Sequence, residues 1–176
     1  MDVALVILVA IIFSAYFSGM EIAFVSSNKL RIEIDKKVGA FGSGIVSSFN
    51  RKPDQFIVTM LIGNNIALVV YGLYMMGPLG GLFQGIIKSN LLLLLVQTII
   101  STLIILLLAE FLPKAVFRKA PNMFLKPFSI PTAIIYGFFY PVTILIIRLS
   151  NLLIRIFFGV KPGPGTTETV FSKVDL

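Results

Sequence analysis

Three long apolar segments constrain this chain more than any other feature of its sequence. They run from Val3 to about Phe24, from Pro53 to about Met76 and from Asn90 to about Leu112. Each is long enough to cross a bilayer as a helix, which takes roughly 20 apolar residues. They are continuously apolar rather than alternating, which argues against a β-barrel. Only 13% of the residues are charged, compared with about 25% in a soluble domain. An all-α integral membrane protein is therefore predicted.

The basic residues predict how these segments are oriented. Ten of them follow the first and third segments: Lys29, Arg31, Lys36, Lys37, Arg51, Lys52, Lys114, Arg118, Lys119 and Lys126. The connection from Gly77 to Ser89, expected to be an external loop, contains Lys88 as its single charge. By the positive-inside rule, both basic stretches are cytoplasmic and the N-terminus is outside. We expect a multi-pass protein of the cell membrane, such as the bacterial inner membrane contains, with a cytoplasmic C-terminus.

The first basic stretch also contains a helical pattern. Between Asn28 and Asp54, apolar residues recur every three or four positions, at Leu30, Ile34, Val38, Ile45, Val46 and Phe49. This spacing predicts two short amphipathic helices, and the glycines between them predict a turn. The expected structure is a short cytoplasmic helix pair.

The segment from Phe128 to Phe158 has two interpretations. It is long enough to be a fourth span, but a crossing would place Arg155 and Lys161 outside, against the charge rule. A broken belt helix at the inner membrane face, with Arg148 and Arg155 at the headgroups, is favoured, so three spans are predicted. Residues 1–160 then form the membrane domain. Residues 161–176 are expected to be a linker towards a cytoplasmic domain absent from this chain.

Two carboxylates lie inside the apolar segments, where an ionised carboxylate costs about 3 kcal/mol and normally faces a bundle interior or an ion path. Glu21 shares one helical face with Ser14 and Ser18, at i, i+4 and i+7. At about 1.5 Å per residue, Glu21 lies roughly 27 Å from Val3, and Glu110 roughly 30 Å from the start of the third segment. Both are therefore expected in the inner half of the membrane.

Glu110 is followed by a proline and a lysine. Pro113 has no N–H, which frees the carbonyl of Ala109. Lys114 is four residues after Glu110, the favourable order for an ion pair on a helix. Two carboxylates against Lys114 give a local formal charge of about −1, which a dication, a sodium ion or a shared proton can balance.

The second segment is interrupted once, at Gly63-Asn64-Asn65. Asparagines in membrane helices often only bond a neighbouring helix. Beside two carboxylates, however, their carbonyls join the oxygen ligands that hard cations select. Gly19 and Gly63 permit local unwinding or a close backbone approach. We expect the three segments to converge on one pocket open to the cytoplasm, and the spacing leaves open which asparagine faces it.

Other chemistry is poorly supported. The chain has no histidine or cysteine, which removes the usual ligands of zinc, copper and iron and the usual general base and nucleophile. A hydrolase pairing Ser18 with Lys114 is a disfavoured alternative, and no enzyme is expected. The basic residues flank apolar segments, so the expected partners are membrane lipids and not nucleic acid.

Three ordered motifs resemble a known family. Ser18-Gly19-Met20-Glu21, Pro53-Asp54-Gln55-Phe56 leading to Leu61-Ile62-Gly63-Asn64-Asn65, and Glu110-Phe111-Leu112-Pro113-Lys114 are similar to the DUF21 transmembrane domain of the CNNM/CorC family. The resemblance covers about residues 1 to 160. It implies a homodimer of protomers with three spans, a cytoplasmic helix pair and a juxtamembrane belt helix.

The resemblance also implies a function, sodium-coupled Mg²⁺ export, with ATP bound by cytoplasmic CBS domains that this chain lacks. Its implied metal ligands are Ser18, the Gly19 carbonyl, Glu21, Asn64 or Asn65, and Glu110, supported by Ser14, Gly63, Pro113 and Lys114. The oxygen ligands alone leave calcium, manganese and sodium open. The alternative function is an ion-sensing membrane anchor that regulates a cytoplasmic domain without transporting.

Overall fold

The computed structural model describes residues 2–158, and all regular structure in this range is helical, as predicted. The elements are α1 (Val3–Val25), α2 (Lys29–Lys37), α3 (Ser43–Asn50), α4 (Pro53–Phe83), α5 (Asn90–Ile105), the π-helical turn η1 (Leu106–Phe111), α6 (Leu112–Lys119), α7 (Pro121–Leu125) and α8 (Ser129–Phe158). The predicted linker, residues 161–176, lies outside the described residues.

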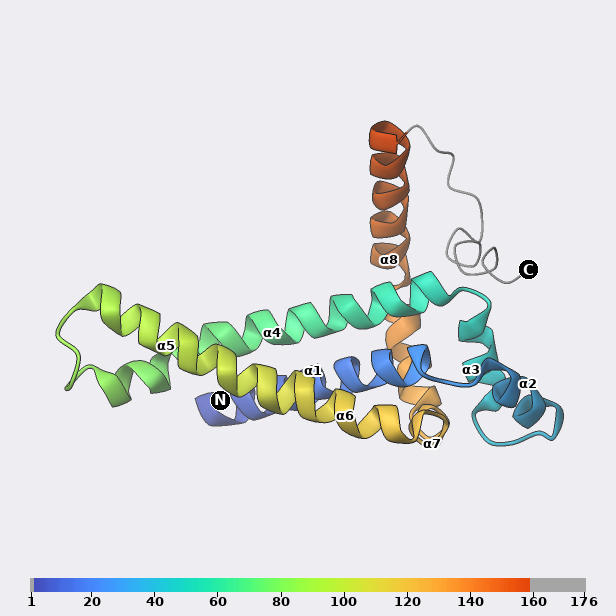
Figure 1. The fold of residues 1–176 in the computed structure, drawn as a ribbon, viewed down its shortest axis with the longest axis horizontal. Coiled ribbons are helices and arrows are strands. Elements are labelled where there is room, and N and C mark those ends of the chain that lie inside the picture. Colours follow the sequence, from blue (N-terminus) through green and yellow to red (C-terminus); the bar gives the residue numbers. More distant parts are fainter. Residues whose placement is uncertain (1, 159–176) are drawn as a thin grey trace, which may run out of the picture.

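A bundle of three long rods forms the body of the molecule (Figure 1). One rod is α1, the second is α4, and the third is the continuous run of α5, η1 and α6. Helix α1 packs most extensively against α4 and also contacts η1, α6 and α7. The N-terminal helix is therefore the element that both other rods contact.

Four helices, one more than the predicted three spans, are long and apolar enough to cross a membrane by length and composition: α1, α4, the α5–α6 rod and α8. The predicted count of three helices able to span the membrane is therefore corrected to four candidates within the described residues. The rods α1, α4 and α5–α6 follow one direction, whereas α8 runs crosswise to them (Figure 1). Helix α8 therefore differs in direction from the other three candidates, and its belt placement stays a prediction.

Helix α4 is longer than predicted, since it continues past Met76 and through Pro78 to Phe83. The expected loop from Gly77 to Ser89 is thus mostly helix. Tertiary contact explains the difference, because Leu79 and Gly80 are buried and the backbone of Gly80 lies against the Gln97 side chain of α5. Packing of this kind overrides the low helix propensity of glycine and proline.

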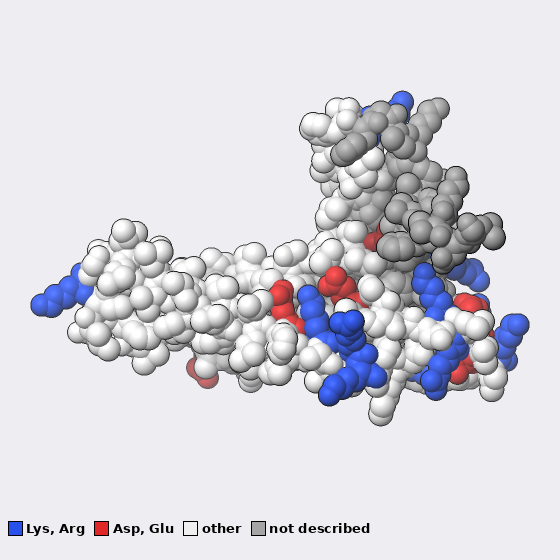
Figure 2. Space-filling view, in the orientation of Figure 1, with Lys and Arg blue, Asp and Glu red and all other residues white. Residues whose placement is uncertain are grey.

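The charged residues are distributed unevenly along the bundle. Figure 2 shows the Lys and Arg side chains gathered towards the end that carries α2, α3, α6 and α7, with an isolated basic side chain at the opposite tip. Lys88 belongs to the α4–α5 connection at that tip. This distribution is what the positive-inside rule expects of a cytoplasmic and an external end.

The short helices α2 and α3 form the expected pair, but α2 buries a different residue from those that its pattern predicted. Leu30 and Val38 are 71% and 80% exposed, Ile34 is also exposed, and Ile32 is buried instead. In α3, Val46 and Phe49 are buried as the spacing predicted. The difference arises because α2 contacts α3 through its polar face.

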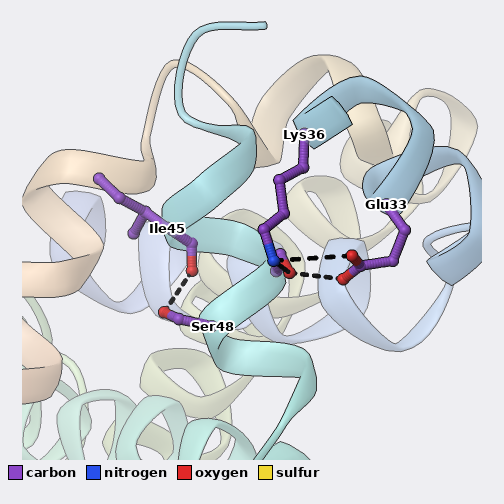
Figure 3. Close-up of polar contacts among 5 residues, drawn as sticks. Glu33, Lys36, Ile45 and Ser48 are labelled. Carbon is purple, nitrogen blue, oxygen red and sulfur yellow. Dashed lines mark hydrogen bonds and ion pairs between the residues drawn. The ribbon is translucent and has the colours of Figure 1, made fainter. Parts of the chain in front are cut away.

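Side-chain bonds join α2 to its surroundings. Figure 3 shows the Lys36 and Glu33 side chains meeting beside α3. Ser47 donates a hydrogen bond to Glu33 at 2.5 Å and accepts one from Lys36 at 3.1 Å. The bond from Ser47 and the positive charge of Lys36 hold the pKa of Glu33 below its usual range. Asp35 pairs with Lys126 at 2.7 Å, which connects α2 to the chain that leads into α8.

Aromatic packing forms the core at the α2–α3 end of the bundle. Phe56 is fully buried, with its ring centroid 4.2 Å from that of Phe24 and 4.9 Å from that of Phe49. Met20 of α1 and Met60 of α4 are fully buried in the same hydrophobic cluster. The buried hydrophobic cluster of the molecule is therefore at the α2–α3 end of the bundle.

A glycine substitution tests the α1–α4 contact. A Cβ atom built on Gly63 would overlap the Phe17 ring, whereas one on Gly72 of the same helix meets nothing within 4 Å. We expect Gly63→Ala to destabilise the protein by about 1–3 kcal/mol through overpacking, and Gly72→Ala to be neutral or slightly stabilising. Thermal unfolding in detergent measures both; equal melting temperatures for the two variants would contradict this packing.

Cysteine labelling tests the direction of α8. The natural chain has no cysteine, so single cysteines at Lys161 and Lys88 can be labelled individually. If α8 lies along the inner face, Lys161→Cys reacts from the cytoplasmic side and Lys88→Cys from the outside. Reaction of both positions from the outside would establish α8 as a fourth span.

Candidate functional site

The candidate site is centred on one stretch of α1. Ser14, Ser18 and Gly19 are buried there, and Glu21 is half-buried. This stretch faces α4 on one side and η1 with α6 on another, because α1 contacts all three elements. The three polar interruptions of the sequence thus lie on α1 and on two elements that contact it, α4 and η1; a common pocket open to the cytoplasm stays a prediction.

The structure distinguishes the two asparagines. Asn64 is 6% exposed, and its Oδ1 accepts a hydrogen bond of 2.6 Å from the hydroxyl of Ser14. Asn65 is exposed on the surface of α4. Asn64 is therefore the asparagine that faces α1, whereas Asn65 is exposed. The helical period accounts for the difference, since adjacent residues lie about 100° apart.

Glycines allow α1 to approach its neighbours closely. The ring of Phe117 in α6 lies against Gly19, where a Cβ atom would come within 2.8 Å of it, and the ring of Phe17 lies against Gly63. Both glycines are inside continuous helices. Of the two roles that the sequence allowed, close approach is the one observed, and local unwinding is not. Phe17 and Phe117 were not predicted, because an aromatic residue in an apolar helix gives no distinguishing signal.

The third rod changes its helical form next to Glu110. Residues Leu106–Phe111 form a π-helical turn, in which Leu112 donates its N–H to the carbonyl of Leu107, five residues back. Pro113 comes two residues after this turn and has no N–H, so it donates no hydrogen bond to a carbonyl of the turn. Short π-helical turns inside α-helices are frequent at functional sites. The proline was the sequence signal for an irregular backbone, but it did not indicate the π form.

The predicted ion pair between Glu110 and Lys114 does not form. Within residues 2–158 the ion pairs are Glu33–Lys36 and Asp35–Lys126. Glu110 belongs to the π-helical turn and Lys114 to α6, so the two residues are not in one regular α-helix, for which the i, i+4 prediction was made. Glu21 instead lies within electrostatic range of both Lys114 and Glu110, with the stronger effect from Lys114.

Ser18 is the least satisfied polar group of the site. Its side chain is fully buried, and its Oγ has no hydrogen-bond partner among the described residues. Buried hydroxyls normally find a partner, as Ser14 does four residues earlier. The Ser18 Oγ is therefore a free oxygen one helical turn from Glu21.

These groups set limits on the chemistry of the site. Within the described range, no three acidic side chains gather closely enough to form a metal site by themselves. A cation here would need neutral oxygens in addition to Glu21 and Glu110. The Ser18 hydroxyl, the Asn64 amide and the carbonyls of the π-helical turn are oxygens of the kind that hard cations accept.

Comparison with known proteins gives two findings. A family model described as the cyclin M transmembrane N-terminal domain matches residues 5–176. The chain is also 28% identical over 155 residues to UPF0053 inner membrane protein YfjD of Escherichia coli (strain K12). That alignment covers 84% of this chain and 33% of the relative, so the chain spans about a third of the relative's length.

The family match includes all three motifs and nearly the whole sequence. Together with the apolar helices of the bundle, it identifies a multi-pass membrane domain. The predicted resemblance is thereby confirmed, and the chain belongs to the cyclin M (CNNM) transmembrane domain family.

Proposed function

We propose that this domain transports Mg²⁺ through a site formed by Ser18, Glu21, Asn64 and Glu110. The observation that carries the proposal is the buried Ser18 hydroxyl, which has no partner among the described residues and lies on the same helical face as Glu21. An oxygen in this position loses water without gaining a protein hydrogen bond, which costs free energy. A bound cation would recover that free energy.

The charges of the site favour a dication. Glu21 and Glu110 contribute two negative charges, and Lys114 reduces the net value to about −1 when all three are ionised. Carboxylates held in a membrane interior are costly without compensation. A divalent ion would reverse the sign of the local charge and would also draw the two carboxylates towards each other. The identity of the ion as Mg²⁺ comes from the family resemblance.

The aromatic contacts suggest how the site closes. Phe17 of α1 packs against Gly63 of α4, and Phe117 of α6 packs against Gly19 of α1. Ser18 lies between Phe17 and Gly19 in the sequence. Movement of α6 away from Gly19 would open a route from the cytoplasmic end. Movement of α4 away from Phe17 would open the bundle on its other side. Coupling of these steps to sodium, the export direction, a homodimeric assembly and ATP binding by following CBS domains are parts of the same proposal.

Transport assays test the two carboxylates. In proteoliposomes, Glu21→Gln and Glu110→Gln are each expected to abolish Mg²⁺ flux, because each removes a charged ligand. The adjacent asparagines provide a matched pair: Asn64→Ala should reduce flux severely, and Asn65→Ala should retain most of it. Flux that survives both glutamine substitutions would exclude this site. Ion binding by the natural chain without any flux would favour an ion-sensing anchor.

Ser18→Ala separates ion binding from stability. The hydroxyl makes no hydrogen bond within the described range, so its removal should leave the melting temperature without Mg²⁺ nearly unchanged. Loss of one ligand should weaken Mg²⁺ binding by about tenfold, or ~1.4 kcal/mol. Ser14→Ala is the contrasting variant, because it breaks the bond to Asn64 and should lower the melting temperature itself. Unchanged Mg²⁺ affinity in Ser18→Ala would remove Ser18 from the site.

A further inference from the structure

Helix α8 consists of two unlike halves. In the first half, Ser129, Thr132 and Thr143 are buried against the bundle. From Ile144 to Phe157 none of the side chains is buried. Figure 1 shows this second half projecting beyond α4, away from the rods. The second half therefore needs an environment that the described part of the chain does not supply.

The second half carries its two arginines and Asn151 on one face, whereas Ser150 lies on the opposite side. Arg148, Asn151 and Arg155 are at i, i+3 and i+7, so they form a single stripe. Large apolar residues cover the other side, and they are exposed: Ile146, Leu149, Leu153 and Phe157. This pattern is that of a helix lying in a membrane interface, with its apolar face in the acyl region and its cations at the headgroups.

The charge on the stripe is one-sided. Residues 144–158 contain two arginines and no aspartate or glutamate. Neither arginine belongs to the ion pairs found between residues 2 and 158. The two positions are about 10 Å apart along the helix axis, since seven residues separate them. Each guanidinium would therefore need its own anion, and a planar guanidinium binds phosphate oxygens through two parallel hydrogen bonds.

The position of α8 indicates where these anions are. Tyr136 donates a hydrogen bond to Gln55 at 2.7 Å, and Thr143 shares one with Thr59 at 3.0 Å, so α8 crosses the first turns of α4. That end of α4 directly follows α3 and lies on the basic side of the molecule. If the basic end is cytoplasmic, as the positive-inside rule predicts, a helix crosswise to the bundle at this level would run along the inner surface of the membrane.

We propose that Arg148 and Arg155 bind the phosphates of acidic phospholipids in the inner leaflet, which makes the second half of α8 a lipid-binding element. The proposal concerns lipid recognition and holds whether or not the domain transports an ion. Its ligand class is a phosphodiester lipid with net negative charge. Zwitterionic lipids contribute acyl contacts but less electrostatic attraction.

Lipid binding at α8 would also affect the bundle. The first half of α8 shares a hydrogen bond of 2.6 Å with α1, between Thr132 and Tyr16. Tyr16 is two residues before Ser18, and α4 is held through Gln55 and Thr59. An anchored α8 therefore restrains both helices that carry the Ser14–Asn64 contact.

The test compares lipid binding by the full chain and its variants. Native mass spectrometry in detergent measures retention of phosphatidylglycerol against phosphatidylcholine. The natural chain should prefer phosphatidylglycerol, and Arg148→Gln/Arg155→Gln should weaken its binding by about thirtyfold, the loss expected for two cations at an acidic surface. The matched control is Arg118→Gln/Lys119→Gln, which removes the same charge from the same end of the molecule and should have a smaller effect.

Three outcomes would overturn the proposal. The first is an equal loss in both double variants, which would mean that net charge alone attracts the lipid. The second is displacement of phosphatidylglycerol by millimolar inorganic phosphate, which would make a soluble anion the ligand. The third is unchanged lipid preference in Arg148→Gln/Arg155→Gln. The arginine side chains are exposed, so these variants should fold, and equal melting temperatures without added lipid check this.

Discussion

The close approach of α1 to the other two rods is the constraint on which the rest of the structure depends. It is possible because a glycine is present at each place where an aromatic ring contacts a helix backbone. The Phe17 ring of α1 contacts Gly63 of α4, and the Phe117 ring of α6 contacts Gly19 of α1. Lipid tails are as apolar as the helix surfaces, so packing of this kind, together with hydrogen bonds, drives helix association in membranes. A methyl group at either glycine would separate the rods and the polar groups between them.

Polar groups within this bundle fall into two classes. Most are satisfied by a neighbour, as in the Ser14–Asn64 bond and in the bond from Tyr71 to the Ser101 carbonyl. Such bonds fix the register of one helix against another. The Ser18 hydroxyl has no partner among the described residues, and the π-helical turn next to Glu110 departs from the regular α-helical bonding pattern. Asn50, Asn122 and Ser129 also have buried polar atoms without a partner in the described range, but only Ser18 is one helical turn from a carboxylate inside the bundle, and this is the physical basis of the proposed ion site.

In the proposed arrangement, helix α8 connects this bundle to the membrane surface. Its first half is bonded to α1 and α4 through hydroxyl and amide groups. Its second half contributes exposed apolar residues and two arginines. The proposed lipid contacts and the proposed ion site therefore act on the same two helices from different places. A change in the position of α1 or α4 would therefore affect the proposed lipid contacts and the proposed ion site together.

The sequence by itself determined the membrane class, the family and the elements that carry the polar groups. These follow from local properties, namely continuous apolar length, charge asymmetry and three short motifs. It also indicated an irregular backbone near Glu110, because proline lacks an N–H. Glu21 and Ser18 were recognisable because a carboxylate and a hydroxyl on one helical face stand out against apolar neighbours.

Only the tertiary structure decided which of these groups meet. Asn64 and Asn65 are equivalent in sequence, and contact with Ser14 selects Asn64. Glu110 and Lys114 form no ion pair within the described range, although their spacing predicts one, and Glu110 lies in a π-helical turn. Helix α4 continues through Pro78 because Leu79 and Gly80 are buried, and α2 turns Ile32 inward in place of its regular apolar stripe. In each case the local pattern allowed two arrangements, and packing against a segment distant in the sequence made one of them lower in free energy.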